Sequence, residues 1–188
     1  MIRSIVRIVA LSSAALLLHA CALQAPRYQL SIDNVEQLKK ANVRPATLGG
    51  FTVQAGATGG GSISLRGNGM SSPVGADYAA YLADALRQEL ALAGKLDPKS
   101  TLEISGVLVK NDIAAGGIST NSGEIEARFI VKSGGQARYD AFKRAELSWD
   151  SSFIGAVAVP KAQQQYPLIV QQLLAKLLAD PLFQKSLQ

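Results

Sequence analysis

Imidazole and thiol groups are almost missing from this sequence, which has one histidine and one cysteine in 188 residues. Both lie near the amino terminus, as His19 and Cys21. Once the leader described below is removed, the chain has no histidine and no free thiol, which excludes Ser-His-Asp and Cys-His catalysis. A zinc site would consist of carboxylates alone, which zinc rarely accepts. The sequence therefore predicts a protein that is not an enzyme and that holds no metal and no cofactor.

Long runs of charge of one sign are also missing. The 19 basic and 14 acidic residues give a formal net charge of +5 and are interspersed along the chain. The longest basic runs are the pairs Lys39-Lys40 and Lys143-Arg144. Because nucleic-acid binding needs a concentrated basic stripe, we expect no nucleic-acid partner. A single cysteine also leaves no internal disulfide, so the fold must depend on an ordinary hydrophobic core.

The first twenty residues have the parts of a secretory signal peptide. Residues 1–7 carry two arginines and no acid, and residues 8–18 are uncharged and mostly apolar. A basic start, a short apolar run and a small residue before the cleavage site are typical of an exported protein. As a helix, the apolar run would extend about 16 Å, roughly half of a ~30 Å hydrocarbon core. We therefore interpret residues 1–20 as a signal peptide rather than a permanent anchor.

The end of the leader resembles a bacterial lipobox, in which Leu18 and Ala20 would precede the acylated Cys21. The resemblance implies a diacylglycerol on the Cys21 thiol and a further acyl chain on its amine, so that the protein would incorporate palmitate. His19 departs from the small residue usual at that position, and the alternative is an ordinary signal peptide that contains a cysteine. Several acyl chains hold a protein firmly on a membrane. By analogy with Gram-negative lipoproteins, Ala22 favours the periplasmic face of the outer membrane.

The remaining chain divides into a linker and one domain. Residues 21–45 are expected to be the lipidated amino terminus and a tether, and residues 46–188 a single α+β periplasmic domain. Within the tether, we expect only a short strand near Tyr28 and a short helix that Asp33 caps.

Periodicity in the domain predicts two helices and four to five strands. Apolar stripes at helical spacing cover residues 77–93 and 167–180. Strand patterns cover residues 46–54, 102–109, 124–132 and 137–151. Tight turns between strands predict an α+β fold of two layers, with a mainly antiparallel sheet and both amphipathic helices on one face. The expected core contains Leu82, Leu86, Leu90, Phe129, Val131, Leu173, Leu174 and Leu177.

Two motifs that suggest chemistry have simpler explanations. Residues 56–69 contain six glycines, but no Gly-Lys-Ser/Thr follows them, so a phosphate-binding loop is excluded. We interpret this segment as a hairpin or lid in which Ile63 and Leu65 form a brief strand, and we expect it to be dispensable for partner binding. Glu124 and Glu126 share one face of a strand with basic residues, which favours a solvated polar ladder over a catalytic pair.

An uncharged segment, residues 152–160, is the candidate partner-binding surface. Core packing would explain its apolar residues, and the alternative is an exposed apolar surface that binds a partner protein or an acyl chain. The candidate residues are Trp149, Phe153, Ile154 and Val157.

The lipobox and the strand–helix–meander–helix order over residues 46–178 resemble small proteobacterial envelope lipoproteins of unassigned function. The resemblance extends loosely to auxiliary lipoproteins of envelope transport systems. It implies a non-catalytic, membrane-anchored lipoprotein of the bacterial envelope that has an accessory or docking role for envelope proteins. The alternative is a binding module for a lipid or other apolar ligand. A continuous apolar cavity between sheet and helices would favour the ligand, and an exposed patch would favour docking.

Overall fold

The computed structural model describes residues 23–188, so the signal peptide and Cys21 lie outside the described residues. The strands are β1 (Leu23–Gln24), β2 (Thr47–Val53), β3 (Ser62–Leu65), β4 (Asn68–Ser71), β5 (Leu102–Ile113), β6 (Thr120–Ser133) and β7 (Gln136–Asp150). The helices are α2 (Ile32–Lys40), α3 (Tyr78–Leu92), α4 (Gly155–Leu178) and α5 (Pro181–Ser186). Within residues 23–188, no helix combines the length and the apolar character needed to cross a membrane.

The fold is α+β, as the sequence predicted, and its strands form two sheets. The larger sheet has the order β2-β5-β6-β7, and the smaller has the order β1-β4-β3. β5, β6 and β7 form the expected antiparallel meander. β2 pairs with β5 in parallel, and so does β1 with β4, which makes both sheets mixed rather than purely antiparallel. In the larger sheet, the reason is the long connection between β2 and β5, which contains β3, β4 and α3 and returns the chain to the end of the sheet where β2 began, as a parallel pair requires.

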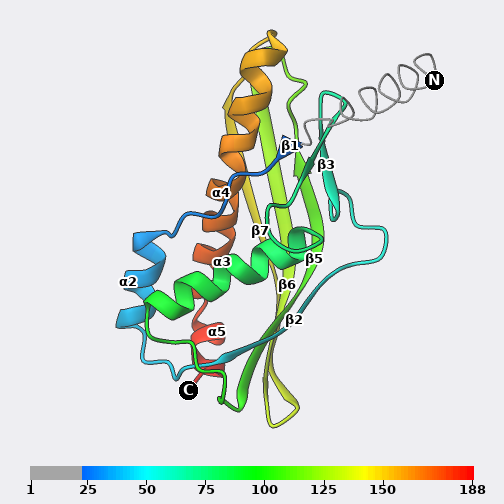
Figure 1. Cartoon of the computed structure of the whole chain (residues 1–188). Helices are drawn as coiled ribbons and strands as arrows, with labels where there is room; N and C mark the ends of the chain where they lie inside the picture. Colours follow the sequence, from blue (N-terminus) through cyan, green and yellow to red (C-terminus); the bar gives the residue numbers. More distant parts are fainter. Residues whose placement is uncertain (1–22) are drawn as a thin grey trace, which may run out of the picture.

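The helices α3 and α4 cover one face of the large sheet (Figure 1). Alternate residues of the long strands point toward these helices, and Ile104, Phe129 and Ala145 are fully buried there. Leu86 of α3 and Leu173 of α4 complete this layer, also at 0% exposure. All eight residues of the expected core are buried.

The last long helix begins well before the predicted start at Pro167. α4 runs from Gly155 to Leu178 and includes both Pro160 and Pro167. An interior proline removes a helical hydrogen bond and costs about 3 kcal/mol in an isolated helix. The cost is offset here because the first half of α4 also packs on the core, with Ala158 and Ala162 at 0% exposure.

The caps of α2 and α3 show how side chains determine where a helix begins. Asp77 caps α3 as expected, because its Oδ1 accepts from the Ala80 amide at 2.9 Å. In α2, Ser31 is the cap in place of Asp33, and its Oγ accepts from the Asn34 amide at 3.3 Å. Asp33 lies in the first turn, where its charge is favourable with the helix dipole.

The amino-terminal segment is part of the folded domain, which corrects the expected tether. β1 completes the small sheet, and α2 packs against α3 and α4. Tyr28, Val35 and Leu38 are buried, with exposures of 6%, 2% and 3%. The physical reason is that residues 23–45 contain enough apolar side chains to offset the conformational entropy lost on ordering. From Leu23 onward, the chain belongs to the domain.

Candidate functional site: an apolar tip

Four large apolar side chains are exposed together at one end of the molecule, where α4 begins. Phe153 is 75% exposed, Ile154 61% and Val157 52%, and Ile118 in the facing loop is 72% exposed. We call these four residues the apolar tip; the end of the fold that carries it is uppermost in Figure 1. Exposed apolar residues in one patch mark a contact surface more often than scattered ones do.

Arg66 connects the loops of the tip to the small sheet. It lies in the turn between β3 and β4, with a φ of 51°. Its Nη1 and Nη2 donate to the carbonyls of Phe153 and Ser152 at 2.7 and 2.8 Å, and its Nε donates to Ala115 O at 2.5 Å. One guanidinium therefore holds the loop before β6 and the loop before α4 in a fixed relation, as its rigid donor geometry permits.

Asn121 makes a second connection beneath the tip. This side chain is 3% exposed; its Nδ2 donates to Ser151 Oγ at 2.6 Å, and its Oδ1 accepts from the Gly117 amide at 2.7 Å. Ser151 Oγ in turn donates to Gly117 O at 2.7 Å. A Cβ at position 117 would lie 1.9 Å from Thr120 O, so only glycine fits there. The apolar side chains therefore project from a backbone that hydrogen bonds hold in place.

Three of the four predicted contact residues meet at this tip, and the fourth does not. Trp149 is 8% exposed and belongs to the core, where it packs near Gly123. It lies on β7 in the same register set as Tyr139 and Ala145, and alternation therefore directs it toward the helices. Sequence analysis missed Ile118, whose one available signal was a single large apolar residue between Gly117 and Ser119 in a loop.

The glycine-rich segment forms the predicted hairpin, but it is integral to the core. Ile63, Leu65 and Met70 are 2%, 0% and 0% exposed. The carbonyl of Gly59 accepts from Asn111 Nδ2 at 2.9 Å, and that of Gly60 accepts from the Tyr78 amide at 2.9 Å. The structure therefore gives this segment a structural role that the expectation of a dispensable loop did not include.

A buried polar cluster lies away from the tip, where α3 meets the amino-terminal segment. Glu89 is fully buried; Tyr28 Oη donates to its Oε1, and Asn34 Nδ2 donates to the same atom at 3.1 Å. Burial raises the pKa of Glu89 above its usual range, against the opposing hydrogen bonds from Tyr28 and Asn34. Asn34 Nδ2 also donates to Gln171 O at 3.1 Å. This cluster joins α2, α3 and α4, which indicates a structural role.

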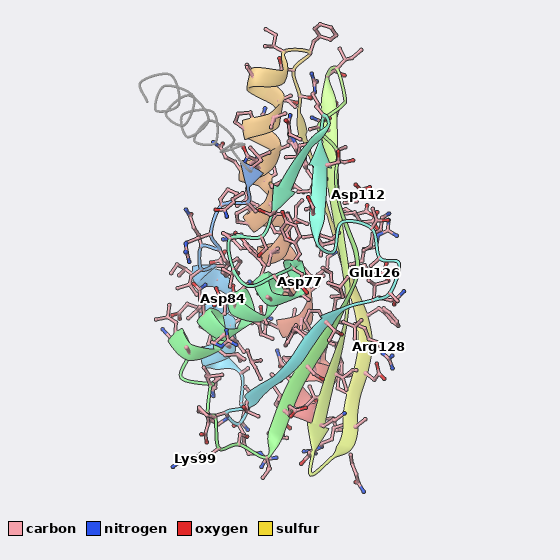
Figure 2. The ribbon with its side chains drawn as sticks, turned by 45° about the vertical axis from the view of Figure 1, so that its right-hand side comes forward. Asp77, Asp84, Lys99, Asp112, Glu126 and Arg128 are labelled. Carbon is pink, nitrogen blue, oxygen red and sulfur yellow. The ribbon has the colours of Figure 1, made fainter. Side chains whose placement is uncertain are left out.

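The face of the large sheet opposite the helices carries the predicted polar ladder. Glu124 accepts from Lys110 Nζ at 2.8 Å and from Arg144 Nε at 2.9 Å. Arg128 Nε donates to Asp140 Oδ1 at 2.6 Å, and hydrogen bonds from Arg128 hold the pKa of Asp140 below its usual range. Figure 2 shows Arg128 on the side of the sheet away from the helices.

Phe142 is a large apolar residue that is exposed on this outer face. It is 55% exposed, and the Arg128 guanidinium lies 5.9 Å from the centre of its ring. We call this surface of β5, β6 and β7 the open sheet face.

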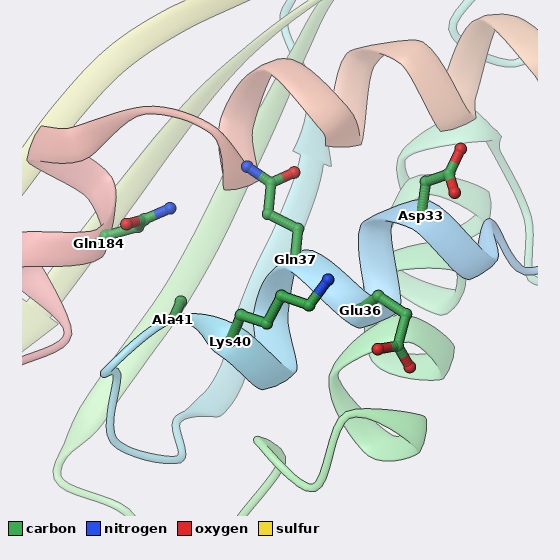
Figure 3. Close-up of a pocket in the computed structure, with 6 residues that line it drawn as sticks. All are labelled: Asp33, Glu36, Gln37, Lys40, Ala41 and Gln184. Atoms are coloured by element: carbon green, nitrogen blue, oxygen red, sulfur yellow. The ribbon is translucent and has the colours of Figure 1, made fainter.

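One surface hollow, about 470 Å³ in volume, lies between α2 and α5. Its lining residues are Asp33, Glu36, Gln37, Lys40, Ala41 and Gln184. Figure 3 shows the carboxylates of Asp33 and Glu36 pointing in different directions, so they do not converge on one ligand. Among residues 23–188, no group of three or more His, Cys, Asp or Glu side chains is placed to hold a metal ion.

Comparison with solved structures finds a similar fold in a bacterial protein. The chain is similar to a Xanthomonas campestris protein assigned to family DUF330, with a TM-score of 0.55 and 11% identity over 87% of this chain and 95% of that one. It is also similar to a candidate lipoprotein of Caulobacter crescentus, with a TM-score of 0.44 and 12% identity over 82% and 96%. No protein-family model and no curated protein sequence matches the chain. The DUF330 likeness defines the class of fold.

Proposed function

We propose that this chain is a non-catalytic lipoprotein of the bacterial envelope that has an accessory role and docks an envelope protein. The signal peptide and the lipobox support an anchor at Cys21 on the periplasmic face of the outer membrane. The likeness to the DUF330 protein supports the α+β domain that would carry the docking surface.

The observation that carries the docking proposal is the open sheet face. β7 has 15 residues, so at about 3.3 Å per residue and about 4.8 Å between strands the three long strands present roughly 50 by 14 Å. This is about 700 Å², close to the roughly 800 Å² that each partner contributes to a stable interface. The helices of the described chain pack on the opposite face, so this area remains available.

The chemistry of the open sheet face suits a protein partner. Phe142 supplies an exposed aromatic anchor, and Arg128 and Asp140 form an ion pair beside it. Aromatic and arginine side chains dominate the energetics of many interfaces. The interspersed charges around them would select a partner whose charges are complementary.

Packing between the layers favours docking over the binding of an apolar ligand. The positions where a ligand would lie are filled by side chains such as Phe129, Leu173 and Leu177, all at 0% exposure. Five surface hollows have volumes of about 240–470 Å³, and Phe129, Leu173 and Leu177 line none of them.

The anchor is tested by labelling cells with radioactive palmitate. The wild-type protein is expected to incorporate label and to sediment with membranes. The Cys21→Ala variant is expected to lose both properties, because it has no thiol to acylate. Equal labelling of the two proteins would contradict the proposal.

Docking is tested by photo-crosslinking in intact cells. A photoreactive phenylalanine analogue at Phe142 is expected to give adducts with an envelope protein, because Phe142 is 55% exposed on the open sheet face, midway along the edge strand β7. The matched control carries the analogue at Ile32, which is 66% exposed on α2 and lies on the helical side. Equal adducts from both positions, or none from Phe142, would refute docking at this face.

A further inference from the structure

We propose that the apolar tip contacts the surface of the lipid bilayer beside the Cys21 anchor. This inference rests on the acylation of Cys21 in the proposed function. It assigns a partner to Phe153, Ile154 and Val157, for which the sequence left a protein and an acyl chain open, and to Ile118, which the structure adds.

The first argument is the short distance along the chain between anchor and domain. Because residues 23–45 are packed on the domain, the chain available as a tether is reduced to the link from Cys21 to Leu23. Two peptide units span at most about 7.6 Å between Cα atoms. An acylated Cys21 would therefore hold the β1 end of the domain next to the headgroups.

The second argument is that β1 begins at the end of the molecule that carries the tip. Leu23 pairs with Met70, and β1 runs parallel to β4, which leads away from the Arg66 turn. The amino end of β1 is therefore directed toward that turn, and about three residues of strand, roughly 10 Å, separate Met70 from it. Arg66 in the turn donates to the carbonyls of Phe153 and Ser152. Figure 1 shows β1 in the same half of the fold as the start of α4.

The chemistry of the tip fits a bilayer interface. Residues 151–160 carry no charged side chain, and three of them are large, apolar and more than half exposed. Peptide carbonyls that enter an apolar environment need hydrogen-bond donors. Arg66 supplies such donors to Ser152, Phe153 and Ala115, while its positive charge is favourable near lipid phosphates.

The experiment uses the complete mature, acylated protein on vesicles of phosphatidylethanolamine and phosphatidylglycerol. Acylation blocks the only native thiol, so an introduced cysteine is the single site for an NBD fluorophore. Ile154→Cys and Val157→Cys report on the tip. Phe142→Cys is the matched control, since Phe142 is 55% exposed on the open sheet face, against 61% for Ile154. Added dithionite, which does not cross the bilayer, reduces NBD at a rate that depends on exposure to water.

We expect dithionite to reduce the label at residues 154 and 157 at least about threefold more slowly than the label at residue 142, because buried apolar positions at an interface exclude water. Equal rates at all three positions, with acylation confirmed by the mass of the amino-terminal peptide, would overturn the tip contact and leave the anchor intact. A mass without acyl chains would refute the proposed anchor, and the tip contact with it. Protection in native envelope membranes but not in lipid vesicles would assign the tip to a protein and overturn the inference.

Discussion

Glu89 places a carboxyl group at 0% exposure between α3 and the amino-terminal segment. Its Oε1 accepts two hydrogen bonds, whereas Oε2 has no partner among residues 23–188. Its spacing from Ala85 and Leu86 places it on the apolar face of α3, but a charged residue normally lies on the solvent-exposed face of an amphipathic helix. Its partners Tyr28 and Asn34 come from a segment expected to be a tether, so its burial could not be predicted from the sequence.

The raised pKa of Glu89 predicts a pH-dependent stability. In the folded state the neutral carboxyl is favoured, so ionisation costs stability as pH rises from the ordinary value of 4.5 through the folded pKa. The free energy of unfolding should therefore fall as pH rises above about 4.5 in the wild type, and Glu89→Gln should flatten this fall. Urea midpoints measured from pH 4.5 upward give the difference.

Glu36→Gln is the matched control for this measurement. The Glu36 side chain is 47% exposed on α2 and forms an exposed ion pair with Lys39. Exposed pairs contribute little, so this variant should follow the wild-type pH profile. Parallel profiles for all three proteins would show that the burial of Glu89 has no energetic effect on folding.

Among the elements, the long strands and the middle of each long helix were predictable, and the joins between them were less so. The strand expected near Tyr28 was wrong, because β1 lies earlier, at Leu23–Gln24. Periodicity identified the meander and the stripe that contains Leu173, because one buried face fixes the spacing of apolar residues. The early start of α4 was not predictable, since Pro160 opposes a helix locally and only packing against the sheet offsets it. The buried hairpin was hidden for a similar reason, because its glycines suggested a loose loop.

The loop between β2 and β3 permits a test with two glycines of similar conformation. Gly56 and Gly59 have φ values of 78° and 69°, so alanine at either position costs about 1 kcal/mol of backbone strain. A Cβ at Gly56 would meet nothing within 4 Å, whereas one at Gly59 would lie 1.7 Å from Asn111 O. Gly59→Ala should therefore lower the free energy of unfolding by more than about 2 kcal/mol. If the two variants have the same denaturation midpoint, the loop at Gly59 does not pack tightly against β5.

At the scale of the whole molecule, the sequence predicted the α+β class and one helical face, but not the extent of the domain. A segment with two short apolar patterns looks too weak to order alone. Residues 23–45 become ordered because α3 and α4 offer them a surface, and that surface exists only once the rest of the chain has folded. The same limit applied to the candidate site, since Ile118 and Phe153 meet only through the fold.

Because the amino-terminal segment is packed on the domain, a charge at two aliphatic positions of α2 should change the free energy of unfolding by very different amounts. Leu38 is 3% exposed, and Ile32 is 66% exposed on the same helix. Leu38→Asp should cost about 3 kcal/mol or more, because it buries an unpaired charge and removes apolar contacts. Ile32→Asp should change stability by less than about 0.5 kcal/mol, as at an ordinary surface position.

Limited proteolysis and chemical denaturation report on this pair of variants. Protease should cleave within residues 23–45 of Leu38→Asp much faster than within those of the wild type. If residues 23–45 were a free tether, both variants would have wild-type stability and all three proteins would be cut at similar rates there.

The docking of residues 23–45 on α4 also implies an order of steps in folding. Gln171 Nε2 donates to the carbonyl of Gln29 at 2.7 Å, across 142 positions in the sequence. Contacts between such distant residues form late, because the chain between them has to be closed first. In an exported chain that emerges amino end first, residues 23–45 must therefore wait for α4 before they dock. During that interval residues 23–45 are not yet docked, and under the proposed function this would give processing enzymes access to Cys21, two residues before the folded domain begins.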